Sequence, residues 1–190
     1  MVYRPTFRKQ GDGSRCAWQN CGPASQAMAS QRFREGKDPL NHHGWPPMPS
    51  EIRNAISPNS CGGTTLQELD AGALLLYNTN MWVRYGVPWA TFQSLIISGR
   101  GAVVQISYSV VHGTKYDGSP NFYGNHGIYV NERRSSDGAY LVYDPLCDHR
   151  RSYIPQGPQW WPAALLRRAA EAMPGTAPGC VNASFTVDTE

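Results

Sequence analysis

Residues 21–25 have the sequence Cys-Gly-Pro-Ala-Ser and decide the interpretation of this 190-residue chain. They follow a turn-rich stretch, and Pro23 presets the φ angle of a first helical turn. Small and apolar residues then recur at helical spacing until Gly36, which predicts a helix that begins at or just after Cys21. The N-terminus of a helix carries partial positive charge and lowers the pKa of a nearby thiol. Cys21 is therefore predicted to be a thiolate nucleophile.

Outward from this helix, the hydrophobic pattern changes from helical to extended. Further helices are predicted at 50–56, at 65–76 behind a capping box, at 88–98 and at 160–172. Strands are predicted at 102–109, 127–131 and 140–143. The order, helices first and strands second, indicates an α+β fold with a C-terminal antiparallel sheet. A single domain is predicted over 1–175, and 176–190 are predicted to be a C-terminal tail that can add an edge strand.

A second candidate site residue and its partner lie on a predicted hairpin. The turn Ser135–Gly138 joins the last two predicted strands; His126 opens the first of them, and Asp144 follows the second. The two residues are about equally far from the turn, and neighbouring strands are ~4.8 Å apart. An imidazole next to a thiol, with a carboxylate that orients it, is what a cysteine nucleophile requires. Cys21, His126 and Asp144 are therefore predicted to form one catalytic group.

The order of these motifs resembles a known family. It runs from Cys21-Gly22-Pro23-Ala24-Ser25 through Gly99-Arg100-Gly101-Ala102-Val103-Val104 and His126-Gly127-Ile128-Tyr129-Val130 to Tyr143-Asp144-Pro145. This pattern, over residues 6–165, resembles the bacteriocin-leader (double-glycine) branch of papain-like cysteine peptidases. The resemblance implies a papain-like fold, with Cys21 as nucleophile, His126 as general base and Asp144 orienting the histidine. It also implies an upstream glutamine in the oxyanion hole, for which Gln10 is preferred over Gln19.

The other cysteines leave two alternatives open. The chain has five cysteines, an odd number at irregular spacings, which does not indicate a disulfide framework: Cys16, Cys21, Cys61, Cys147 and Cys180. Cys16 is a second thiol close to Cys21, so it is a rival nucleophile. Cys16, Cys21, Cys147 and His149 could also bind zinc, although their spacing is not that of the usual zinc motifs. The peptidase chemistry itself needs no metal and no organic cofactor.

Composition limits the partners. Hydrophobic residues make up 41% and charged residues 16% of the chain, which is typical of a folded soluble protein. The net charge of +3 comes without a concentrated basic patch, so no nucleic-acid partner is expected. There is no apolar run of the ~18 residues that span a bilayer and no secretory signal. We expect synthesis in the cytoplasm, with the protein retained there unless another process releases it.

The expected substrate is a peptide. The resemblance implies cleavage of a leader peptide, and a phage-type peptidase that cuts peptidoglycan peptides, free or within a virion tail, also fits the chain. The polar stretch from Tyr108 to Tyr123, just before His126, is predicted to be a lid or recognition loop. The alternative is a papain-like scaffold without activity that serves as a structural or binding component of a phage tail.

Overall fold

The computed structural model describes residues 2–37, 44–57, 59–112, 124–146 and 157–187. The elements in chain order are η1 (Ala17–Gln19), α1 (Cys21–Phe33), α2 (Pro49–Ile56), α3 (Leu66–Tyr77), β1 (Met81–Pro88), α4 (Trp89–Ile97), β2 (Ala102–Ser107), α5 (Ser109–His112), β3 (Asn125–Arg133), β4 (Tyr140–Tyr143), β5 (Gln159–Trp161), α6 (Ala163–Glu171) and β6 (Cys180–Thr186).

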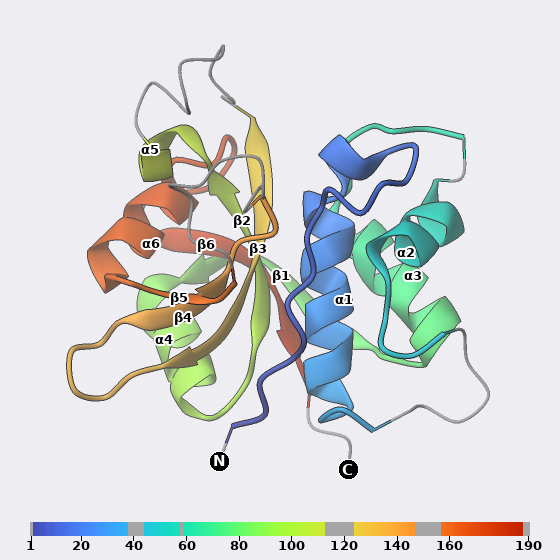
Figure 1. Ribbon diagram of the computed structural model, residues 1–190. Coiled ribbons are helices and arrows are strands. Elements are labelled where there is room, and N and C mark those ends of the chain that lie inside the picture. Colours follow the sequence, from blue (N-terminus) through green and yellow to red (C-terminus); the bar gives the residue numbers. More distant parts are fainter. Residues whose placement is uncertain (1, 38–43, 58, 113–123, 147–156, 188–190) are drawn as a thin grey trace.

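The strands form one antiparallel sheet between two layers of helices. Its strand order is β1-β6-β2-β3-β4-β5. Helices α1–α3 cover one face, and α4–α6 lie on the other side of the sheet (Figure 1). The expected α+β class with an antiparallel sheet is confirmed.

Alternation along the central strands builds a separate core on each face of the sheet. Successive side chains of a strand point to opposite faces. Val103 and Tyr129 pack with α1–α3, whereas Val104 and Ile128 pack with α4 and α6. Helix α1 is rich in alanine and serine, and its residues 22–32 are all buried, so it can approach the sheet closely. This packing fixes the start of α1 against the middle of the sheet.

The C-terminal strand corrects one expectation. Strand β6 lies between β1 and β2, so the prediction of an edge strand within a tail at 176–190 is wrong. Val181, Ala183 and Phe185 are fully buried in the core, and the residues between them are buried as well. An interior strand buries both of its faces, which the sequence pattern of 176–190 did not indicate.

Local features explain how three other elements compare with the prediction. Strand β1 was not predicted, because most of its side chains are exposed or half-buried and show no regular alternation. The last helix begins at Ala163 and not at 160, since Trp160 and Trp161 pair with β4 before Pro162. The capping box of α3 is confirmed: the Glu68 amide donates to the Thr65 hydroxyl at 3.2 Å.

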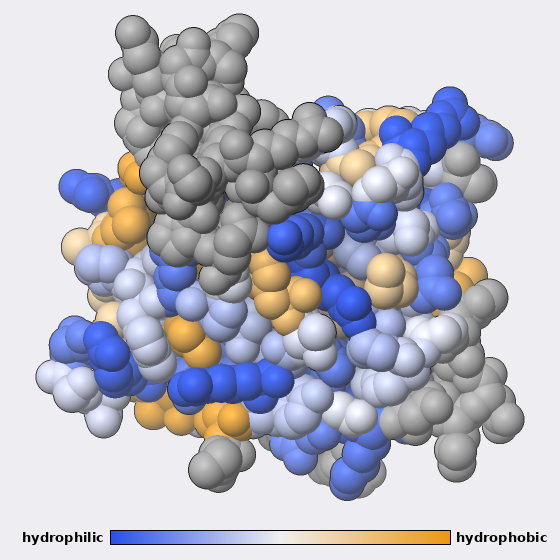
Figure 2. Space-filling view, in the orientation of Figure 1, coloured by the Kyte–Doolittle hydropathy of each residue, from blue (hydrophilic) through white to orange (hydrophobic). Residues whose placement is uncertain are grey.

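The surface is mixed in character. On the face shown in Figure 2, hydrophobic residues form separate areas between hydrophilic ones. Among the residues that the structure describes, no helix has the length and apolar character needed to span a membrane.

Candidate active site

The thiol of Cys21 is carried by the first residue of α1, with Asn20 as the N-cap. Amides in the first turn of a helix have no acceptor within the helix and place positive partial charge there. Burial raises the pKa of the Cys21 thiol. The hydrogen bond and charge of His126 and the amides of Gly127 and Gly22 together lower this pKa by more than burial raises it. The net pKa lies below the ordinary thiol value, so the thiolate is favoured. The predicted place of Cys21 at a helix N-terminus is confirmed.

Two glycines allow α1 to approach β3 closely at this point. A Cβ atom at Gly127 would lie 3.1 Å from the Cα of Gly22. A Cβ atom at Gly22 would in turn collide with the side chain of Thr64. The Ser25 hydroxyl donates to the Gly127 carbonyl at 3.0 Å and ties the helix to the strand. This close contact brings the N-terminus of the nucleophile helix beside the start of β3.

His126 and Asp144 meet at one end of the β3–β4 hairpin. Tyr129 pairs with Tyr143, which makes Asp144 a diagonal neighbour of His126. The Nε2 of His126 and the Oδ1 of Asp144 are 2.7 Å apart, and both side chains are buried. Burial lowers the pKa of His126, whereas the charge and hydrogen bond of Asp144 and the hydrogen bond of Cys21 raise it to about 10. Because Nε2 faces the carboxylate, Nδ1 is the ring nitrogen left for the thiol.

Tyr108 and Leu146 hold the Asp144 carboxylate as well. The Tyr108 hydroxyl donates to Oδ2 and the Leu146 amide to Oδ1, each at 2.9 Å. The Tyr108 ring also packs against the His126 ring at 4.6 Å between centroids. Burial raises the pKa of Asp144, but His126 and these two donors together lower it by more than burial raises it, so the group is a carboxylate. Tyr108 is thus buried and does not begin a lid; residues 113–123 lie outside the described part of the chain.

The two glutamines considered for the oxyanion hole lie in different surroundings. Gln10 is buried. Its backbone N–H donates to the Pro145 carbonyl at 2.9 Å, and its side-chain Nε2 donates to the Trp18 carbonyl at 3.2 Å. Its side-chain oxygen is buried without a hydrogen-bond partner among the described residues. Gln19 lines the cavity that contains Cys21, whereas Gln10 is not among the described residues that line it. The preference for Gln10 stays a prediction, and the place of Gln19 in the cavity wall weighs against it.

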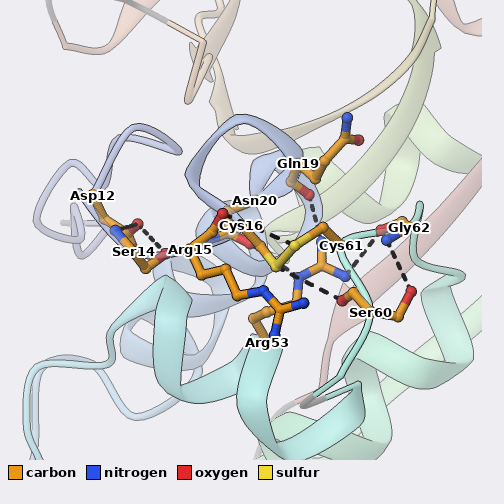
Figure 3. The surroundings of a disulfide bond; sticks show 10 residues. All are labelled: Asp12, Ser14, Arg15, Cys16, Gln19, Asn20, Arg53, Ser60, Cys61 and Gly62. Carbon is orange, nitrogen blue, oxygen red and sulfur yellow. Dashed lines mark hydrogen bonds between the residues drawn. A yellow bond between two sulfur atoms is a disulfide. The ribbon is translucent and has the colours of Figure 1, made fainter.

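A disulfide joins Cys16 to Cys61 across a sequence separation of 45 (Figure 3). The number and spacing of the cysteines did not indicate this bond, so the expectation of no disulfide framework is corrected by one bridge. Spacing along the chain carries no information on this pair, because the folded loops bring the two Cα atoms to 5.1 Å. Since Cys16 is no free thiol, it is not a rival nucleophile. The free cysteines among the described residues are Cys21 and Cys180.

The disulfide also bears on the zinc alternative. It occupies Cys16, one of the four ligands that this alternative needs. Cys147 and His149 lie outside the described residues. Within the described ranges, no group of three or more His, Cys, Asp or Glu side chains could hold a metal ion.

A cavity of about 300 Å³ opens beside Cys21 and His126. The other described residues that line it come from both halves of the chain: Trp18, Gln19, Gly22, Gly63, Thr64, Thr65, Leu66, Leu69, Val103, Gln105, Asn125, Gly127 and Met173. None of these side chains is charged. The cavity can therefore accept an uncharged part of a peptide next to the thiol.

Comparison with known proteins identifies the fold. No protein-family model and no curated protein sequence matches this chain. Thirteen chains of solved structures do match. One is the crystal structure of a Bacillus anthracis protein assigned as a C39-like peptidase; the match covers 100% of this chain and 98% of that one, with a TM-score of 0.62 and 14% identity. At this identity the likeness shows a shared fold: the chain has the fold of that C39-like protein.

Proposed function

We propose that this protein is a cysteine peptidase in which Cys21 is the nucleophile, His126 the general base and Asp144 the residue that orients the histidine. The observation that carries the proposal is that carboxylate, imidazole and thiol are brought together at one cavity. Asp144 lies 2.7 Å from one side of the imidazole, and Cys21 and His126 line the same cavity, where His126 lowers the pKa of the thiol. Thiolate, base and orienting acceptor are the three requirements of such a nucleophile. The fold shared with a C39-like protein supports the same function.

In the proposed reaction, the Cys21 thiolate attacks the carbonyl carbon of a peptide bond. As the C–N bond breaks, the His126 imidazolium gives its proton to the leaving amine, and a thioester remains on Cys21. The neutral imidazole then takes a proton from water, whose oxygen attacks the thioester. Release of the carboxylic acid regenerates thiolate and imidazolium, and no metal or organic cofactor takes part.

The oxyanion of the tetrahedral intermediate needs donors near the nucleophile. The Cys21 amide, at the first position of α1, is one donor in this proposal. A glutamine side chain is the second, and the choice is between Gln10 and Gln19. Comparing Gln10→Ala with Gln19→Ala separates them, because loss of an oxyanion donor lowers kcat by ~100-fold or more.

The proposed substrate is a peptide with uncharged residues at the scissile bond, which suits the uncharged wall of the cavity. The resemblance in the sequence implies a leader peptide, and a peptidoglycan peptide also fits the chain. A library of peptides of both types, digested and analysed by mass spectrometry, tests cleavage and decides between them.

The test of the mechanism uses a peptidyl vinyl sulfone, which forms an adduct with a positioned thiolate. We expect one adduct per chain, on Cys21, and none in the variant Cys21→Ser. Cys180→Ser is the matched control, since Cys180 is the other free cysteine among the described residues. Labelling of Cys21 no faster than Cys180, together with no cleavage of any peptide, would favour the inactive scaffold instead.

A further inference from the structure

Arg53 is a buried cation near the nucleophile, and the reaction proposed above does not use it. It lies on α2 and is 2% exposed. Its guanidinium donates from Nε to Oδ1 of Asn20 at 3.0 Å, from Nη1 to the Gly62 carbonyl at 3.0 Å and from Nη2 to the Gln19 carbonyl. Figure 3 shows the side chain reaching between these three residues.

All three acceptors are neutral oxygens, so these bonds use three of the five N–H groups without neutralising the charge. A buried charge is costly unless another group compensates it. Burial lowers the pKa of Arg53, and the negative charges of Cys21 and then Glu68 oppose this effect. The charge of Cys21 is the larger of these two opposing effects. The interaction is mutual, so Arg53 acts on the thiolate as well, but its effect is smaller than those of His126, Gly127 and Gly22, which are the main groups that lower the pKa of Cys21.

The guanidinium also joins the two segments that flank the thiol. Two of its acceptors, Gln19 and Asn20, directly precede the nucleophile, and Asn20 is the N-cap of α1. The third, Gly62, leads into the cavity wall at 63–65. The disulfide in Figure 3 links the same two segments covalently.

We propose that Arg53 is a positioning residue of the Cys21 site. It fixes the residue before the nucleophile against the rim of the cavity, and its positive charge favours the thiolate. The inference rests on the proposed peptidase function and adds a residue from α2 to it.

Several groups act on the charge of the thiol besides Arg53. The N-terminus of α1 and the His126 imidazolium of β3, with Asp144 behind it, favour the thiolate. Glu68 of α3 acts on the charge of Arg53. A change in the titration of Cys21 must therefore be compared with a variant that leaves these groups in place.

The experiment compares Arg53→Ala, Arg53→Lys and the control Arg134→Ala in the full chain. Arg134 is exposed beyond the far end of β3, where it pairs with Asp137, so its removal changes net charge equally. The first measurement is the pH midpoint of Cys21 alkylation by iodoacetamide, which reads the thiolate. The second is the rate of adduct formation with the peptidyl vinyl sulfone, which also reads the position of the thiol in the cavity. Near-UV circular dichroism checks that each variant is folded.

For Arg53→Ala we expect the alkylation midpoint to rise by a fraction of a pH unit, and the vinyl sulfone rate to fall by about tenfold or more. For Arg53→Lys we expect a midpoint close to the parent but a vinyl sulfone rate about tenfold lower, because an ammonium keeps the charge and loses the planar fork. Arg134→Ala should match the parent in both measurements. Added methylguanidinium should restore part of the rate in Arg53→Ala.

A folded Arg53→Ala variant with the parental midpoint and vinyl sulfone rate would overturn the inference. If that variant does not fold, Arg53→Lys decides: a parental vinyl sulfone rate overturns the inference, and a tenfold loss at an unchanged midpoint supports it. A midpoint near the ordinary thiol value of about 8.5 in the parent protein would instead contradict the proposed peptidase function itself.

Discussion

Replacing Gly127 by alanine tests whether the close contact between α1 and β3 sets the geometry of the site. The added Cβ would lie 3.1 Å from the Cα and 3.3 Å from the amide nitrogen of Gly22. Ordinary contacts between such atoms are about 3.5–4.0 Å. Both neighbouring atoms belong to the backbone, so the helix and the strand must move apart by a few tenths of an ångström.

This movement has two expected costs. Overpacking of a tight contact lowers the free energy of unfolding by about 1–3 kcal/mol, which for a chain of this size lowers Tm by about 2–4 °C per kcal/mol. The same movement separates Cys21 from His126. Since a misplacement of about 1 Å can cost ~100-fold in rate, a few tenths of an ångström should cost about three- to tenfold.

The assay is thermal unfolding together with the rate of Cys21 alkylation at pH 6. Gly11→Ala is the matched control, because a Cβ at Gly11 has no atom within 4 Å and the same entropy is removed from the unfolded chain. If Gly127→Ala and Gly11→Ala melt at the same temperature and react at the same rate, the close contact does not constrain the site and the reasoning is refuted.

Three further outcomes are expected. Because the pKa of Cys21 is lowered, its thiolate persists as the pH falls, so iodoacetamide at pH 6 should label Cys21 at least about tenfold faster than Cys180; peptide mapping would reveal the opposite order. Tyr108→Phe removes a hydrogen bond to a buried carboxylate and should lower the free energy of unfolding by about 1.5–3 kcal/mol, and urea denaturation equal to the parent would contradict this role. Replacing Cys16 and Cys61 together by serine should cost about 4 kcal/mol for a separation of 45 residues, measured by urea denaturation against Cys180→Ser.

Local signals in the sequence predicted the elements that form the site. Pro23 and the small residues after it placed Cys21 at the start of a helix, and the structure begins α1 there. The turn at Ser135–Gly138 predicted the hairpin that brings His126 and Asp144 together. Because Tyr129 pairs with Tyr143, the position opposite Asp144 is that of Ile128, so His126 and Asp144 are diagonal neighbours and not directly opposite.

Contacts between distant segments were beyond such signals. The disulfide, the bonds of Arg53 to Gln19 and Asn20, and the contact of Tyr108 with Asp144 join residues 33 to 45 positions apart. Nothing in the local pattern around Tyr108 distinguishes a buried hydroxyl that binds a carboxylate from an exposed loop residue. Burial and pairing of this kind follow from the tertiary fold alone.

The interior place of β6 also determines when the sheet can be completed during protein synthesis. When translation has reached residue 175, five of the six strands exist, but β1 has no partner in the sheet, and β2 begins a separate four-stranded piece. The open edges of both pieces present unpaired N–H and C=O groups that can pair with other chains. Only the arrival of 180–186 joins them, so a nascent chain that stalls shortly before this segment is expected to be prone to aggregation and proteolysis even though every site residue has been translated.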